Sequence, residues 1–241
     1  MKHLLLLLGL TSISASAAPQ LNIGSFYEYF EGNRSTSLKR IYNSGDTAAF
    51  VKVSVAELVY DADGKTTEVP LDGLPAEQRS LIASPARVIV PTDGMQQVRL
   101  LYRGKRDVER YFRLRFIPVQ PETNDGFGLN SEQAKQYNDA LSAGVSVLAG
   151  YGAIMFVKPA QTKYATQVLH EPGRFRVHNQ GNATVVLDHF NDCDMSGEHC
   201  VPPTKHHIRP GKELSFEKKS GRLYRFVLEE GQQQRDVEFK G

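Results

Sequence analysis

Four residues near the end of the chain have side chains that could bind a metal ion: His199, Cys200, His206 and His207. Zinc and copper sites use imidazole and thiolate ligands, but this spacing matches none of their usual signatures. The only other cysteine is Cys193. A metal-handling role would require both thiols to be reduced, whereas a disulfide would leave no thiolate. We therefore expect no metal ion and no other cofactor.

Motifs for catalysis are absent from the sequence. It contains no Gly-rich phosphate loop, no nucleophile elbow and no His-Glu-x-x-His pattern. The carboxylates Asp61, Asp63 and Asp72 are scattered and typical of turns, and the formal glycosylation site at Asn182 also fits a turn. We expect a protein that is not an enzyme.

The first residues, MKHLLLLLGLTSISASA, have the pattern of a secretory signal peptide. A basic Lys2 precedes the apolar run Leu4–Leu10, and small residues follow, so we expect cleavage after Ala17, with Ala18 as the alternative. No other segment is long and apolar enough for stable membrane insertion. In an oxidising compartment the two cysteines, Cys193 and Cys200, are expected to form one local disulfide. The formal net charge of +2 gives no reason to expect binding to nucleic acid.

The remaining chain alternates apolar and polar residues in short runs separated by turns, which is typical of antiparallel β-sandwiches. In the run 110–119, Phe112, Leu114 and Phe116 alternate with polar or basic residues. The one predicted helix is 131–141, with Ser131 as a possible N-cap. The sequence therefore predicts an all-β protein.

An uncharged strip at 145–157 is the least polar part of the chain after residue 17. Its small and β-branched residues favour a strand, which is either an ordinary buried strand or one shared with another protein. A polar stretch, 120–144, precedes it, and a loop of that length is commonly functional or disordered. Lys158-Pro159-Ala160 ends the strip. We therefore predict two domains, 18–158 and 160–241.

The order of these blocks resembles the periplasmic chaperones of the chaperone–usher pilus pathway. The similar blocks are LIASPARVIVPTDGMQQVRLLYRG, ERYFRLRFIPV after it, the long loop and GYGAIMFVKP. The ERYFR segment and the two cysteines followed by Pro210-Gly211-Lys212 are closest to the alternative, common-pilus type. The resemblance covers nearly the whole chain after residue 17.

This resemblance implies two immunoglobulin-like domains in a boomerang arrangement and a function without catalysis. Such chaperones donate an edge strand to pilus subunits that lack their last strand, and pass them to an outer-membrane usher. Alternate side chains of the strand fill the subunit's open core. Here the expected donor residues are Val145, Val147, Ala149 and Tyr151, with Leu148 in the chaperone's own core. The long loop is expected to order only when a subunit binds.

Classical members of this family hold the subunit's terminal carboxylate with an Arg on the first strand and a Lys on the shared strand. Here the matching residues are Tyr27 and Ile154, so another basic residue must bind the carboxylate. If 110–119 pairs antiparallel with the strip, Arg113 lies near Ile154 and is our first candidate. The other candidates are Arg99 and Lys158.

Lys158 has a second possible role, since the matching residue in the family forms an ion pair between the domains. Its partner here would be Asp107 or Glu109. The alternative to a chaperone is a secreted two-domain adhesin or a pilus component. A pilus component would carry an N-terminal donor extension of alternating apolar residues, whereas APQLNIGSFYEYF leads directly into a predicted strand.

Overall fold

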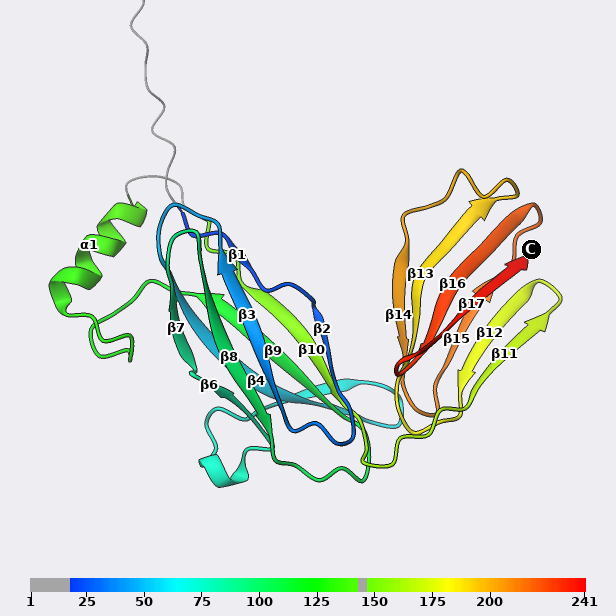
Figure 1. Ribbon diagram of the computed structural model, residues 1–241, viewed down its shortest axis with the longest axis horizontal. Helices are drawn as coiled ribbons and strands as arrows, with labels where there is room; N and C mark the ends of the chain where they lie inside the picture. The colour runs from blue at the N-terminus through cyan, green and yellow to red at the C-terminus, as the bar shows by residue number, and fades with distance from the viewer. Residues whose placement is uncertain (1–17, 143–146) are drawn as a thin grey trace, which may run out of the picture.

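The computed structural model describes residues 18–142 and 147–241, which form two β-sandwiches (Figure 1). The two sandwiches meet at one end and diverge from it, which gives the molecule a bent outline. The predicted all-β fold with two immunoglobulin-like sandwiches in a boomerang arrangement is confirmed. The predicted signal peptide, residues 1–17, lies outside the described residues.

The N-terminal sandwich contains the first ten strands. They are β1 (Leu21–Asn22), β2 (Tyr27–Phe30), β3 (Thr36–Asn43), β4 (Ala49–Tyr60), β5 (Thr66–Pro70), β6 (Leu81–Ser84), β7 (Arg87–Val90), β8 (Gly94–Tyr102), β9 (Arg110–Pro118) and β10 (Tyr151–Val157), with a 3₁₀ turn at Ala76–Gln78. One sheet has the order β1-β3-β8-β6. The other has the order β2-β10-β9-β4-β5, and β7 pairs with the start of β4. The turn between β7 and β8 therefore crosses from one sheet to the other.

Alternation along the strands decides which residues fill the space between these sheets. On β9, Phe112, Leu114 and Phe116 are fully buried, as predicted, while Arg113 and Arg115 lie on the outer face and are partly exposed. A period of two sends successive side chains to opposite faces of a sheet. The apolar row of β9 therefore belongs to the core, and its basic row is available for contacts outside it.

The C-terminal sandwich contains the other seven strands. They are β11 (Thr166–Glu171), β12 (Arg174–Asn179), β13 (Val185–Asp194), β14 (Thr204–Ile208), β15 (Glu213–Glu217), β16 (Arg222–Glu230) and β17 (Gln233–Lys240). The sheets have the orders β11-β12-β15 and β14-β13-β16-β17. Aromatic rings dominate the core between them, with Phe175 stacked on Phe239 at 4.0 Å and Phe190 on Phe216 at 4.3 Å.

The predicted disulfide joins Cys193, in β13, to Cys200. The two residues also form an isolated β-bridge, so the bond closes one short hairpin. Arg225 donates a hydrogen bond to the carbonyl of Gly197 inside that loop. The disulfide therefore stabilises a local turn of the C-terminal sandwich, as the seven-residue separation led us to expect.

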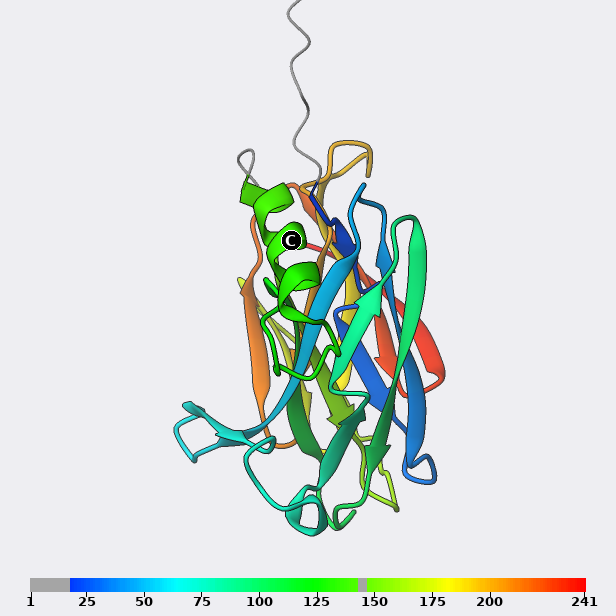
Figure 2. The ribbon, with the colours of Figure 1, turned by 90° about the vertical axis from the view of Figure 1, so that its left-hand side faces the viewer.

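The polar stretch before β10 contains the one helix of the described residues, α1 (Ser131–Ser142). Figures 1 and 2 show α1 beside the N-terminal sandwich, on its side away from the C-terminal sandwich. The Tyr137 hydroxyl donates a hydrogen bond to the Ala48 carbonyl at 2.7 Å, and its ring lies 4.7 Å from that of Phe50. Residues 120–142 are therefore folded onto the sandwich, which differs from the expectation of a loop ordered only by a binding partner.

The N-cap of α1 is Asn130, which corrects the prediction of Ser131. Asn130 Oδ1 accepts a hydrogen bond from the Gln133 backbone N–H at 2.9 Å, and Gln133 Oε1 accepts one from the Asn130 N–H at 3.1 Å. This reciprocal pair is a capping box. Ser131 is thus the first residue inside the helix.

Candidate functional site

The edge of β10 changes character at Ile154. Along one side β10 pairs antiparallel with β9 over its whole length, from Tyr151 to Val157. On the other side it pairs parallel with β2 only from Ile154 onward, where the Ile154 N–H donates to the Phe26 carbonyl at 2.8 Å. Among the described residues, no strand pairs with this side of β10 between Tyr151 and Ala153. An open strand edge with unpaired backbone groups can accept a strand from another protein.

The strand predicted at 145–157 is shorter than expected, since β10 begins at Tyr151. Val145 lies outside the described residues. Val147 and Ala149 are exposed and not part of a strand, and Val147 keeps 74% of its surface exposed. An apolar side chain in that position gains no burial from its own fold, and so is free to be buried by another molecule.

Tyr151 behaves differently from the other predicted donor residues. It packs in part against the core of the N-terminal sandwich, and the next residues of its row, Ala153, Met155 and Val157, are buried in that core. The reason is the period of two: the odd-numbered row of β10 faces inward. Tyr151 is therefore at least partly engaged by its own domain, and Leu148, expected in the core, is only half-buried.

A hollow of about 300 Å³ runs beside the open edge. Its lining comes from the outer row of β9 and from residues at the start of β10: Arg113, Arg115, Ile117, Gly150, Tyr151 and Gly152. The predicted antiparallel pairing is confirmed, because Arg113 lies opposite Ile154 and Arg115 opposite Gly152. Gly150 and Gly152 have no side chains to fill this part of the surface, so the hollow leaves the outer face of β9 at both arginines uncovered.

Both arginines contact one carboxylate, that of Glu68 on β5. Glu68 Oε1 lies 2.8 Å from Arg113 Nε, and Glu68 Oε2 accepts a hydrogen bond from Arg115 Nη2 at 2.5 Å. The Arg115 hydrogen bond, with the positive charges of both arginines, holds the pKa of Glu68 below its ordinary value. Glu68 was not predicted from the sequence, because its one signal is an acid on a short strand without clear alternation.

The three predicted carboxylate-binding residues are not brought together. Arg99 is on β8, in the other sheet, where it lines a different hollow with Arg34, Leu38 and Arg40. Lys158 follows β10 and is only 4% exposed. Arg113 is thus the one candidate that lies beside the open edge.

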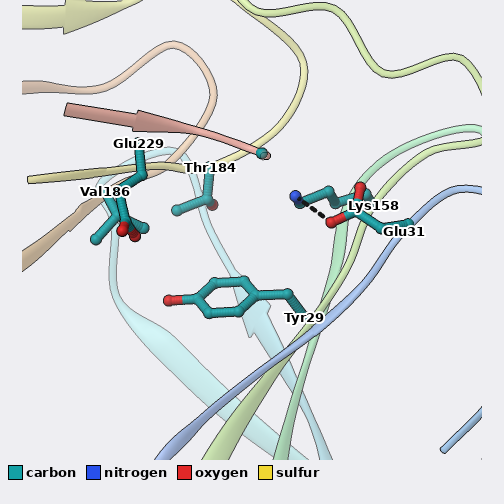
Figure 3. A pocket seen from close by; sticks show the side chains of 7 residues that line it. Tyr29, Glu31, Lys158, Thr184, Val186 and Glu229 are labelled. Carbon is teal, nitrogen blue, oxygen red and sulfur yellow. Dashed lines mark hydrogen bonds and ion pairs between the residues drawn. The ribbon is translucent and has the colours of Figure 1, made fainter. Parts of the chain in front are cut away.

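Lys158 forms its ion pair with Glu31, which corrects the expected partners Asp107 and Glu109. The Nζ–Oε1 distance is 2.8 Å (Figure 3). Burial lowers the Lys158 pKa, but its hydrogen bond to Glu31 and the nearby Tyr164 hydroxyl outweigh that effect, so the pKa is raised. Glu31 is closer than either expected residue because it follows β2, which runs parallel to β10 and ends beside Lys158.

Glu109 instead links the two sandwiches through hydrogen bonds. Its Oε2 accepts from the Thr184 backbone N–H at 2.8 Å and from the Thr184 hydroxyl at 2.6 Å, and also from the Tyr111 hydroxyl. Burial raises the Glu109 pKa, and these hydrogen bonds oppose that effect. Thr184 and Lys158 both line the small cavity between the sandwiches shown in Figure 3.

Tyr27 and Ile154, at the positions matching the family's usual Arg and Lys, lie opposite each other in the register of β2 and β10. Neither residue is charged, and Tyr27 belongs to an aromatic cluster. The His207 ring lies 4.2 Å from that of Tyr27 and 4.9 Å from that of Phe156, and His207 Nε2 is hydrogen-bonded to the Tyr29 hydroxyl at 2.7 Å. Burial lowers the pKa of His207 to about 4. The aromatic cluster and the Tyr29–His207 hydrogen bond thus join the two sandwiches, at the place where classical members of the family have an Arg and a Lys.

The histidines considered as metal ligands have separate environments. His207 is in the aromatic cluster. His199 Nδ1 is hydrogen-bonded to Asp194 Oδ2 at 2.7 Å, and His206 Nε2 to the Thr204 hydroxyl at 2.8 Å. Within the described ranges, no group of three His, Cys, Asp or Glu side chains is placed to hold a metal ion. In the same ranges, no helix is long and apolar enough to cross a membrane.

Comparison with known proteins gives a consistent result. No family model matches the chain. It is 26% identical over 217 residues to the probable fimbrial chaperone EcpB of Klebsiella pneumoniae strain 342, covering 90% of this chain and 89% of that protein. It is also 26% identical over 219 residues to the protein of the same name from Escherichia coli O157:H7, with the same coverage.

Solved structures of pilus chaperones share the fold. The class 5 fimbriae chaperone CfaA matches with a TM-score of 0.55 and 19% identity, covering 91% of this chain and 98% of that one. The CsuC–CsuE chaperone–tip adhesion subunit complex of Acinetobacter baumannii matches with a TM-score of 0.52 and 15% identity, covering 91% and 97%. The resemblance to pilus chaperones inferred from the sequence is confirmed by the two EcpB proteins, and the solved structures show the shared fold.

Proposed function

We propose that this protein is a periplasmic chaperone that binds pilus subunits by donating the edge of β10. The observation that carries the proposal is the open edge from Tyr151 to Ala153, with the uncharged segment 147–150 before it, in a fold shared with pilus chaperones. A subunit strand added to this edge would form main-chain hydrogen bonds with it. The function requires no catalysis, in keeping with relatives that are named chaperones.

Val145, Val147 and Ala149 are the residues proposed to enter the subunit's core, with Tyr151 at the end of the row. Burying a fully exposed Val side chain contributes about 1.5–3 kcal/mol. The 74% exposure of Val147 supports this role, because about three quarters of that gain is still available. Pairing with a subunit would extend β10 upstream from Tyr151.

The subunit's terminal carboxylate is proposed to bind Arg113. From Ile154 onward β2 occupies the edge of β10, so an added strand must end near that level. Arg113 lies opposite Ile154 on the neighbouring strand, and an Arg–carboxylate pair is a strong, charge-assisted contact. Arg99 is in the other sheet, and Lys158 is already paired with Glu31, so both are weaker candidates.

Delivery of the subunits to an outer-membrane usher is part of the proposal, as is removal of residues 1–17 on export to the periplasm. The proposed domain boundary is at Lys158–Ala160, between the last strand of the first core and the first strand of the second. A pilus component is disfavoured, because Leu21 and Ile23 are buried in the protein's own core and do not form a donor extension.

Co-expression with the pilus subunits encoded beside this gene tests the proposal. A tagged chaperone should co-purify from the periplasm with at least one of them in a one-to-one complex. Subunit recovery should fall to background without the chaperone, because an incomplete sandwich exposes its core. Normal subunit yield without the chaperone, together with no co-purification, would contradict the proposed function.

A further inference from the structure

We propose that Glu68 competes with the subunit's terminal carboxylate for Arg113 and Arg115, and so sets how easily a bound subunit is released. This inference rests on the proposed function. The subunit's terminus and Glu68 carry the same chemical group, a carboxylate. Glu68 already holds the two arginines of the hollow beside the open edge, at 2.8 and 2.5 Å.

The position of Glu68 makes such competition physically simple. It is on β5, the edge strand of the same sheet, and all five residues of β5 are exposed. The Glu68 side chain can therefore swing into solvent without exposing any core residue. Separating the Glu68 carboxylate from the two arginines costs little free energy, because partly exposed ion pairs contribute weakly to stability and the released carboxylate is hydrated.

The hydrogen bonds around Glu68 are uneven. Arg115 donates a short hydrogen bond to it, whereas Arg113 Nε is buried and has no hydrogen bond among the described residues, although Glu68 Oε1 is 2.8 Å away. Buried donors without an aligned acceptor are unfavourable. Glu68 therefore satisfies Arg115 better than Arg113, and Arg113 has more to gain from a second carboxylate.

The charges also leave room for a second anion. In the described ranges, Glu68 is the one acid within ion-pair distance of Arg113 or Arg115, so the group of three carries one net positive charge. Arginine retains its charge at any physiological pH. A terminal carboxylate would neutralise the site if Glu68 stayed, and would leave a net positive charge if Glu68 were displaced.

The consequence for function is a balance between capture and release. Glu68 reduces the gain from binding the subunit's carboxylate, because part of the arginines' interaction is already satisfied. The same carboxylate can return to the arginines when the subunit leaves. Removing its charge should therefore tighten binding, chiefly by slowing dissociation.

The test uses a synthetic peptide of the last ten residues of the co-purified subunit, prepared with a free carboxylate and with a terminal amide. Dissociation constants and dissociation rates are measured by biolayer interferometry for the full chain and for Glu68→Gln and Glu68→Ala. The wild type should prefer the free carboxylate. Both variants should increase that preference about two- to fivefold, with no change for the amide.

Glu57→Gln is the matched control, because Glu57 pairs with Arg110 on the same sheet, away from the hollow. It should leave the preference unchanged. Circular dichroism melting confirms that each variant is folded. If the two Glu68 variants reduce the preference or leave it unchanged while the wild type discriminates, the inference is wrong. If the wild type binds neither peptide, or binds both equally, the failure lies in the proposed function.

Discussion

The edge of β10 and the edges of the C-terminal sandwich are built from different residues. Edge strand β17 carries Arg235, Asp236, Glu238 and Lys240 within eight residues, and β15 begins and ends with glutamate. From Val147 to Ala153, the segment that leads into β10 and the open edge itself have no charged residue. Charges at an edge prevent pairing with other chains. Edge strands β15 and β17 are thus protected against strand addition, and the open edge of β10 is not.

A charge in the segment that leads into the open edge should protect β10 against strand addition, as the charges on β15 and β17 protect those edges. Val147→Asp should abolish subunit capture, because a carboxylate without a partner inside the subunit costs roughly 3–5 kcal/mol, more than a hundredfold in affinity. Val147 is exposed in the free protein, so the variant should fold normally. Co-purification of a pilus subunit measures capture.

The matched control for this variant is Gln234→Asp, which adds the same charge to β17, an edge that is already charged. It should leave capture intact. Equal loss in both variants would mean that net charge, and not strand addition at β10, governs binding. Normal capture by a folded Val147→Asp protein would make the open edge an ordinary surface.

The basic row beside the open edge should add affinity beyond strand pairing. Arg113→Ala should weaken subunit binding by about 2–5 kcal/mol, because removing one partner of a hydrogen-bonded charge pair leaves the other unpaired. Arg115→Ala should weaken it less, since Arg115 is two residues further from the point where β2 closes the edge. Dissociation constants of the purified complexes measure both.

Equal effects of the two arginine variants would point to general damage to β9. A large effect of Lys158→Ala with none at Arg113 would place the carboxylate site at the junction of the sandwiches. In that case the hollow beside β10 has no part in carboxylate binding.

The disulfide should affect only the C-terminal sandwich. Replacing Cys193 and Cys200 with Ser should lower the free energy of unfolding by about 2 kcal/mol, because the bond closes a short loop in the unfolded chain. Subunit capture should persist, since the bond is far in the fold from β10. Chemical denaturation and co-purification measure the two effects, and loss of folding would mean that the bond does more than stiffen one hairpin.

The contact between the sandwiches should make stability depend on pH. The pKa of His207 is about 4 in the folded protein and about 6.5 in an unfolded chain, so the unfolded state binds more protons between these values. Stability should therefore be full above pH 6.5 and fall as the pH drops toward 4. Because the ring is partly exposed, we expect a loss of about 1–2 kcal/mol.

Denaturation at pH 7 and pH 4.5 measures this loss. His207→Phe keeps a ring in the aromatic cluster and should reduce the pH dependence. His189→Gln changes an exposed histidine and should not. The same pH dependence in the wild type and in His207→Phe would assign it to other groups, such as Glu109.

Features that depend on neighbours along the chain were predicted well. The alternation of β9, the helix at 131–141 and the local disulfide follow from residues close together in sequence, and all three are confirmed. The N-cap was one residue wrong because Ser131 and Asn130 are both good caps, and only the hydrogen bond to Gln133 distinguishes them.

Contacts between distant residues were predicted poorly. Lys158 and Glu31 are 127 positions apart, and the Tyr29 and His207 that join the sandwiches are 178 apart. The acid that pairs with Lys158 is set by the position where the parallel strand β2 ends. The periodicity of the sequence does not predict that position. Glu68 was missed for the same reason, because its partners are on a strand to which β5 is not paired.

The sequence by itself determined the strand content, the faces of the strands and an uncharged strip before Lys158, because these follow from side-chain chemistry at a period of two. Only the tertiary structure decided where that strip becomes a strand and which part of its edge is open. Both depend on β2, which lies more than a hundred residues earlier and pairs with β10 only from Ile154. A strand's own residues specify its two faces, but its edges are specified by whichever strands the whole fold places beside it.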